Sequence, residues 1–271
     1  MSSDLLAGVS VLDFGTVGPA ARASAILADY GATITKVGAV PRAGAVTITP
    51  PAFAYSGGRG TRRVQLDLKA DKGRAAAQAL AAASDVVIES FRPGVADRLG
   101  IGWNELSTQN PRLVYCSTSG YGQNGPASQR AGHDLNYLAV GGFLDCSGRR
   151  DDGGPALPGA TVADIAAGGM QAAMAIMAAL IGRGNTGEGR YLDVSIVDGV
   201  VAMMSLYVDE YLVTGTEPGP GHNVLTGRYA WYGIYRCADD GWISVGAIEP
   251  RFYANLLREL DLDSERFGSA Q

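Results

Sequence analysis

A strand, a helix and a second strand follow one another within the first 37 residues, and this order constrains the fold more than any other feature. Residues 8–14 form an apolar, β-branched run. Pro19 suits the first position of a helix, and Gly31 suits the position just after its end. Residues 32–37 then indicate a second strand. Two strands joined by such a helix pair in parallel through a right-handed crossover.

The same alternation continues along the chain. Residues 64–68 indicate a strand, residues 71–83 an alanine-rich helix, and residues 85–89 and 113–117 two further strands. Long apolar segments at about 161–182 and 195–214 indicate helices. The sequence therefore predicts an α/β fold with a Rossmann-like, doubly wound parallel sheet.

The composition changes after residues 215–227, a segment with two prolines and several glycines. Residues 228–235 and 241–246 are aromatic, β-branched strands joined at an Asp-Asp-Gly turn. A helix is expected from about residue 249 to 260. These elements predict a second, smaller α+β domain.

We therefore expect a large domain over residues 1–194, a helix and linker over 195–228, and a small domain over 229–271. The chain stops soon after the last expected helix, which has no partner in the sequence. We expect the small domain to be incomplete and a C-terminal segment to be missing.

Charge and cysteine usage exclude several classes of protein. The net charge is −5, from 22 basic and 27 acidic residues, which argues against a nucleic-acid surface. Three well-separated cysteines without a C-x-x-C pair suggest neither a disulfide framework nor a zinc site and fit a reducing cytoplasm. The first twenty residues show no secretory signal. We expect a cytoplasmic protein without a bound metal.

Residues 165–181 are apolar apart from one glutamine, but their alanine and glycine content favours a buried helix over a membrane span.

The first strand-to-helix turn lacks the G-x-G-x-x-G spacing, and Lys36 stands where an acidic residue would bind a ribose. A nicotinamide cofactor is therefore not expected.

Basic residues gather after two of the expected strands. Lys69 follows one strand, and Arg92 and Arg98 follow another. Ligands of such sheets bind at the carboxyl ends of the strands, where guanidinium groups suit phosphate oxygens. A solvated charged rim explains the same residues equally well.

One histidine and two carboxylates are candidates for acid–base chemistry. His133 stands in a polar, glycine-rich segment, and imidazole titrates near neutrality. Asp164 and Glu249 each stand at the head of an expected helix, where an acid is also favoured as a cap. A histidine with two carboxylates is the minimum set for moving protons at carbon.

Read together, these segments resemble family III CoA-transferases over nearly the whole chain, and within them the racemase branch. The resemblance rests on a series of motifs in order: Gly18-Pro19 with residues 27–32, then residues 63–69, 89–100, 119–126, 131–137 and 245–253. Transferases of this fold usually have a tyrosine where Gly132-His133-Asp134 stands here. The histidine therefore resembles that of the racemases.

The resemblance implies a racemase that inverts the α-carbon of 2-methylacyl-CoA thioesters, with the CoA moiety of the substrate as its sole cofactor-like group. His133 and Asp164 would be the two catalytic bases, and Glu249 would orient the histidine. Residues 1–194 would form the CoA-binding domain. The implied CoA contacts are Leu66, Asp67, Leu68, Lys69, Ser90, Phe91, Arg92, Arg98, Gly132, Asp134 and Tyr137.

Two alternatives stay open. One is a CoA-transferase in which Asp164 is the nucleophile of an acyl-CoA anhydride. The other is a non-catalytic CoA-binding subunit of a two-chain complex. The resemblance also implies an interlocked homodimer, or a companion chain that supplies the missing segment. Relatives have an acid and an arginine after the second strand, whereas this chain has Lys36 and Arg42 there.

Overall fold

The computed structural model describes residues 4–15, 18–41, 58 and 60–262. It divides into two compact units. The first comprises residues 1–141 and 159–203, and the second comprises residues 142–158 and 204–271, within the described ranges. The boundaries expected after residues 194 and 228 stay predictions.

The first unit is built on a parallel sheet. Within the described residues its strands are β1 (Ser10–Asp13), β2 (Thr33–Gly38), β3 (Arg62–Gln65), β4 (Val86–Glu89), β5 (Val114–Ser119) and β6 (Arg190–Ser195). They lie in the order β3-β2-β1-β4-β5-β6, and every neighbouring pair is parallel. The predicted Rossmann-like sheet is thereby confirmed, and its strand order reverses between β1 and β4.

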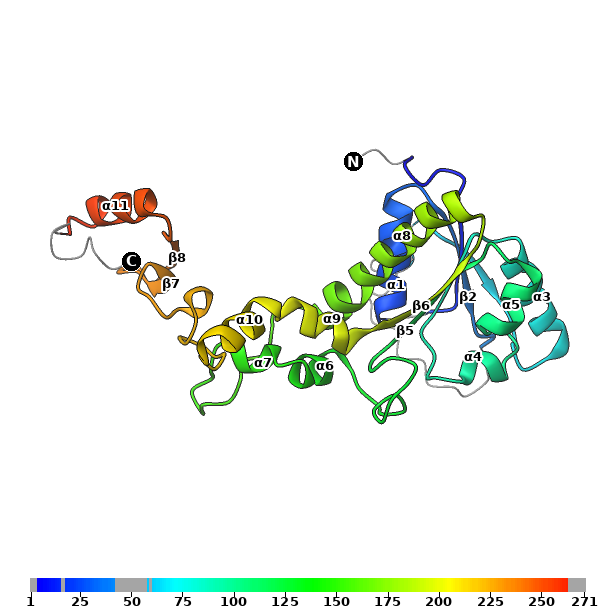
Figure 1. The fold of residues 1–271 in the computed structure, drawn as a ribbon, viewed down its shortest axis with the longest axis horizontal. Helices are drawn as coiled ribbons and strands as arrows, with labels where there is room; N and C mark the ends of the chain where they lie inside the picture. The colour runs from blue at the N-terminus through cyan, green and yellow to red at the C-terminus, as the bar shows by residue number, and fades with distance from the viewer. Residues whose placement is uncertain (1–3, 16–17, 42–57, 59, 263–271) are drawn as a thin grey trace. The chain divides into compact units, whose positions relative to one another are not determined.

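Helices cover both faces of this sheet. Helices α1 (Gly18–Asp29) and α8 (Gln171–Thr186) lie on one face, and α3 (Asp71–Ala82) and α5 (Trp103–Gln109) lie on the other (Figure 1). Shorter helices complete the unit, namely α4 (Val95–Arg98), α6 (Asp134–Val140), α9 (Ile196–Met203) and the π-helical segment η1 (Ala163–Met170).

Alternation along the buried strands explains why two cores form. Val11 on β1 packs in the core beneath α1 and α8, whereas its neighbour Leu12 packs in the core beneath α3 and α5. Cys116 and Tyr115 on β5 divide in the same way. Because successive side chains of a strand point to opposite faces, an unbroken apolar strand supplies both cores.

A buried ion pair lies beside the point where the strand order reverses. Asp13 on β1 is directly opposite Lys36 on β2, and the two side chains are in contact. The Lys36 ammonium also donates to the Ser24 hydroxyl at 3.1 Å, and the Gly15 amide donates to the Asp13 carboxylate at 2.6 Å. Lys36 thus compensates a fully buried carboxylate and helps to fix the turn after β1.

Several boundaries differ from those predicted. The expected helix over 161–182 is the π-helical η1 followed by α8, and the expected helix over 195–214 breaks at Met204 into α9 and α10 (Ser205–Thr214). Strand β6 was not predicted. By length and composition, residues 163–186 could cross a membrane, whereas here they pack against α1, β5 and β6.

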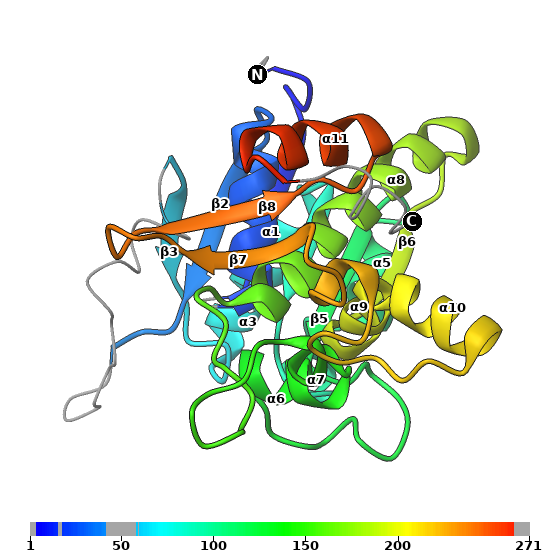
Figure 2. The ribbon, with the colours of Figure 1, turned by 90° about the vertical axis from the view of Figure 1, so that its left-hand side faces the viewer.

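The second unit contains the predicted hairpin and helix. Strands β7 (Tyr232–Arg236) and β8 (Trp242–Gly246) pair antiparallel, and α11 (Pro250–Glu259) lies beside them (Figures 1 and 2). Tyr253 of α11 packs edge-on against Trp231 at 5.4 Å between ring centroids. The unit also includes α7 (Phe143–Cys146) and the 3-10 turn η2 (Val224–Thr226).

Candidate functional site

Close packing of three helices positions the segment that carries Asp164. Asp164 stands in the first turn of η1, which packs against α1 and α9. One of its carboxylate oxygens lies 3.7 Å from the position that a Cβ of Gly18 would take. A Cβ on Gly199 of α9 would lie 2.2 Å from the Ala167 carbonyl oxygen. Only glycine therefore permits this approach of α9 to η1.

Asp134 joins the start of α6 to the start of η1. Its carboxylate accepts a hydrogen bond of 2.8 Å from the Asp164 amide. His133 is the residue just before α6, and its own amide donates to the Asn136 side chain at 3.0 Å. The capping of the two helices thus brings the exposed His133 and the half-buried Asp164 into electrostatic range of each other.

Burial raises the pKa of Asp164 above its ordinary value, and the neighbouring Asp134 carboxylate raises it further. The positive charges of His133 and Arg22 oppose this shift. The raised pKa of the aspartate lies closer to the ordinary pKa of imidazole. The two groups are therefore suited to accepting and donating one proton in turn. The role of Arg22 was not predicted, although its place one turn after Pro19 could have indicated it.

Tyr137 connects this pair to the expected CoA contacts. Its hydroxyl donates to the Gly132 carbonyl at 2.6 Å, and its ring packs edge-on against Tyr121. Burial and the negative charge of Asp164 raise the pKa of Tyr137 to about 12, while Arg92 opposes the shift. The Arg92 guanidinium is therefore within electrostatic range of the Tyr137 hydroxyl.

The expected CoA contacts after β4 lie in one turn and the helix that follows it. Ser90 and Phe91 are half-buried, and Arg92 and Arg98 are exposed. The Val95 amide donates to the Arg92 carbonyl at 3.0 Å, which closes the turn into α4. Both guanidinium groups are thereby available at the carboxyl edge of the sheet, where ligands of this fold bind.

Residues 66–69 lie after β3, and β2 and β1 separate them from the turn after β4. Leu66 and Leu68 pack partly into the core beneath α3. The Asp67 carboxylate accepts from the Lys69 amide at 3.1 Å, and the Lys69 side chain is exposed. Of these four residues, Lys69 offers the charge that a phosphate requires.

The third expected acid–base residue lies in the second unit. Glu249 immediately precedes α11, and its carbonyl accepts from the Tyr253 amide at 2.9 Å. Its proposed contact with His133 stays a prediction. Arg42 lies outside the described residues.

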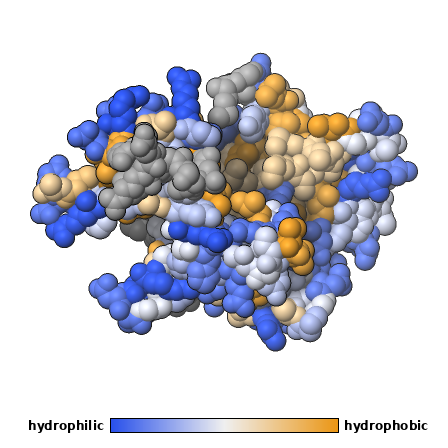
Figure 3. All heavy atoms as spheres, turned by 60° about the vertical axis from the view of Figure 1, so that its left-hand side comes forward, coloured by the Kyte–Doolittle hydropathy of each residue, from blue (hydrophilic) through white to orange (hydrophobic). Residues whose placement is uncertain are grey.

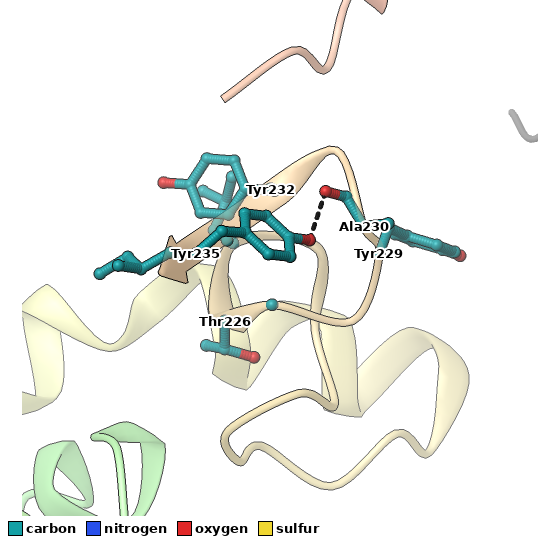
Figure 4. A pocket seen from close by; sticks show the side chains of 9 residues that line it. Thr226, Tyr229, Ala230, Tyr232 and Tyr235 are labelled. Carbon is teal, nitrogen blue, oxygen red and sulfur yellow. Dashed lines mark hydrogen bonds between the residues drawn. The ribbon is translucent and has the colours of Figure 1, made fainter. Parts of the chain in front are cut away.

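The second unit also contains a cavity of about 530 Å³, drawn in Figure 4. Three tyrosines line it, and the Tyr235 hydroxyl donates to the Ala230 carbonyl at 2.6 Å. No carboxylate or imidazole is among its lining residues.

Among the described residues, no group of three or more His, Cys, Asp or Glu side chains could hold a metal ion. Within the first unit, the expected acid–base residues His133 and Asp164 interact electrostatically.

The fold and the site define a doubly wound α/β protein whose histidine and aspartate lie over the carboxyl edge of the sheet. The chain belongs to CoA-transferase family III, whose model matches residues 6–270. The chain is 37% identical to human alpha-methylacyl-CoA racemase, over 96% of this chain and 66% of the racemase. It is 34% identical to human succinyl-CoA:glutarate CoA-transferase, over 95% and 59% respectively.

Among solved structures, a CAIB/BAIF family protein from Brucella suis superposes with a TM-score of 0.81 at 29% identity, over 96% of this chain and 70% of that one. The predicted family is therefore confirmed. The chain spans about two thirds of the length of the racemases that it matches.

Proposed function

We propose that this protein is a racemase that inverts the α-carbon of 2-methylacyl-CoA thioesters by two-base proton transfer. The observation that carries the proposal is the juxtaposition of His133 with the half-buried Asp164. The identity to racemases and the histidine within Gly132-His133-Asp134 also support it.

The chemistry requires one base on each face of the α-carbon. One base removes the α-proton, and the electron pair of the broken C–H bond passes into the thioester as an enolate. The conjugate acid of the other base then delivers a proton to the opposite face. The His133–Asp164 pair must hold one proton at the start, and the two groups exchange roles with the handedness of the substrate.

The raised pKa of Asp164 serves both directions of this scheme. A neutral Asp164 can donate when His133 is the base, and an ionised Asp164 can accept when the imidazolium is the acid. Both proton transfers use these side chains alone and call for no redox group or metal beyond the CoA thioester itself. Arg92, Arg98 and Lys69 would bind the phosphates of CoA.

Incubation of one epimer of a 2-methylacyl-CoA in D₂O tests the proposal. We expect deuterium to enter at the α-carbon while the epimers equilibrate. Transfer of CoA to a free acid without α-exchange would instead assign a transferase. Binding of CoA with neither reaction would assign a non-catalytic CoA-binding subunit.

The transferase is the second candidate because its relatives are nearly as similar as the racemases. In that reaction Asp164 would attack the thioester carbonyl, form an acyl anhydride and release CoA thiolate. The thiolate would then attack the aspartyl carbonyl, which gives an aspartyl-CoA thioester and releases the donor carboxylate. The acceptor carboxylate would displace CoA thiolate from this thioester to form a second anhydride, and the thiolate would attack the acceptor's acyl carbonyl, which forms the new acyl-CoA and frees Asp164. His133 has no assigned task in this scheme, which favours the racemase.

We further propose that the protein works in the cytoplasm as a dimer with a second copy, or with a companion chain. Large apolar side chains are exposed in the second unit, and some of the exposed apolar residues are visible in Figure 3. Val213 on α10 is 85% exposed, Ile234 on β7 is 73% exposed and Trp242 on β8 is 70% exposed. Exposed apolar surface of this kind favours a partner. The three unpaired cysteines fit a reducing compartment.

A further inference from the structure

Glu89 is a buried acid at the carboxyl end of β4. Its side chain is 3% exposed, yet it lies directly before the turn that carries Arg92. One carboxylate oxygen accepts a hydrogen bond of 2.7 Å from the Phe91 amide. The other accepts from the Ser117 hydroxyl on β5. The same carboxylate therefore joins a neighbouring strand to the turn.

The hydrogen bonds continue across the sheet. The Tyr191 hydroxyl on β6 donates to the Ser117 hydroxyl oxygen at 3.3 Å, so that Ser117 is oriented to donate to Glu89. A cavity of about 260 Å³ is lined by these three residues and by Arg92. The network and the guanidinium thus share one cavity wall.

The turn that carries Arg92 is held at three backbone positions. The Val95 amide donates to the Arg92 carbonyl, and the exposed Gln129 side chain donates to the Pro93 carbonyl at 3.2 Å. The third tie is the one from the Phe91 amide to Glu89. The acceptor of this hydrogen bond is the buried Glu89, and its donor is the residue immediately before Arg92.

We propose that Glu89 is a positioning residue, which holds the Phe91 amide and thereby presents Arg92 to the phosphates of CoA. This inference rests on the proposed function of Arg92. Glu89 itself touches no substrate in the scheme. Its effect is on the conformation of the turn, and the strength of that effect depends on the charge of the carboxylate.

The environment of Glu89 makes this charge variable near neutrality. Burial raises its pKa to about 7, although the hydrogen bonds from Ser117 and Phe91 oppose the shift. An ionised carboxylate is the stronger acceptor, since charge-assisted hydrogen bonds are roughly twice as strong as neutral ones. The titratable or charged groups that face it are Asp97, Asp193, Tyr115, Cys116, Tyr191 and Arg92.

The sign of the pH effect follows from the raised pKa. Above pH 7 the ionised Glu89 holds the Phe91 amide firmly, and CoA affinity is highest. As the pH falls through about 7, the carboxyl group becomes neutral. The tie to the turn then weakens, and CoA affinity falls.

Calorimetric titration with free CoA between pH 6 and pH 8 tests this inference. The wild-type protein, Glu89→Gln and Arg92→Ala are compared, with the exposed Glu188→Gln at the amino end of β6 as the matched control. We expect the wild type and the control to gain about fivefold in affinity over this range relative to Glu89→Gln. The phosphate of CoA ionises near pH 6, and this ionisation contributes equally to the proteins that retain Arg92. The difference therefore reports Glu89.

Ser117→Ala provides a second measurement that does not alter Glu89. Its hydroxyl lowers the pKa of Glu89, so removing it is expected to move the midpoint of the affinity change to higher pH. The double variant Glu89→Gln, Arg92→Ala should bind CoA no more weakly than Arg92→Ala alone, because the effect passes through Arg92.

The outcomes separate this inference from the function on which it rests. Unchanged CoA affinity in Arg92→Ala would overturn the assignment of Arg92 to the phosphates, and the role of Glu89 with it. Weakened binding in Arg92→Ala, together with wild-type affinities at every pH in Glu89→Gln, would overturn the positioning role alone.

Discussion

The backbone amide of Asp164 donates a hydrogen bond of 2.8 Å to the carboxylate of Asp134. This bond ties the first turn of η1 to the first turn of α6, two segments that are 30 residues apart in the chain. It also places a second negative charge beside Asp164, which raises the pKa of that carboxyl. Asp134 thus affects both the position and the acidity of the proposed base.

Replacing either proposed base should abolish most of the activity while leaving the fold intact. We expect His133→Ala and Asp164→Ala each to lower kcat by about 10²- to 10⁴-fold, the usual loss for a general acid or base. Deuterium exchange at the α-carbon measures the effect, and thermal unfolding checks the fold. Near-normal turnover in either variant would remove that residue from the scheme.

Asp134→Asn should lower the pKa of Asp164. The amide oxygen can still accept from the Asp164 backbone, but the negative charge that raises the pKa is gone. The acidic midpoint of the pH–rate profile should therefore move to lower pH. Asp134→Ala removes the hydrogen bond as well, and we expect a larger loss of kcat from it. Identical pH profiles in the wild type and the Asn variant would contradict this assignment.

Gly199→Ala should destabilise the first unit. The added methyl group would lie 2.2 Å from the Ala167 carbonyl oxygen, so the backbone of α9 or η1 has to shift. We expect a loss of about 1–3 kcal/mol in the free energy of unfolding. Gly182→Ala in α8 is the matched control, because nothing lies within 4 Å of its added methyl group. That change should stabilise the protein by up to about 1 kcal/mol.

Arg92→Ala and Arg98→Ala should each weaken the binding of free CoA by about 10- to 100-fold, as expected for lost hydrogen bonds to a charged group. The turnover of bound substrate should change much less. Added salt should weaken wild-type binding, since exposed charge pairs are screened. Wild-type affinity for CoA in both variants would indicate that these arginines are solvated surface residues without a role in CoA binding.

Mixing the inactive His133→Ala and Glu249→Ala proteins tests whether active sites are shared between subunits. If Glu249 of one subunit reaches His133 of another, mixed dimers contain one intact site and part of the activity returns. Light scattering measures the molar mass of the protein in solution and so its oligomeric state. A stable, fully active monomer would contradict both the shared site and the need for a companion chain.

The sheet was predictable because β1, β4 and β5 are apolar on both faces. Strand β6 was not, because Arg190, Tyr191 and Asp193 are exposed at the edge of the sheet and interrupt any apolar run. The break at Met204 was also missed, since the apolar pattern continues through it.

The candidate site was predicted only in part. Residue type and motif indicated His133 and Asp164, but their proximity depends on capping contacts between α6 and η1 that no local pattern reveals. Glu89 carried no sequence signal for burial. A charged residue at the end of a strand normally faces solvent, and its 3% exposure results from β5 and the turn after β4 closing over it.

The division of the chain into units has a consequence for folding during synthesis. Residues 142–158 belong to the second unit, yet they precede residues 159–203, which complete the first. On the ribosome, the first unit can therefore close at Met203 while the loop that it leaves behind still waits for residues 204–262. At translation rates of 5–20 residues per second, the synthesis of residues 204–262 alone takes about 3–12 seconds. During this interval the nascent chain carries Phe143 and Leu144 without the rest of their unit, and a chaperone that binds apolar segments would find its target there.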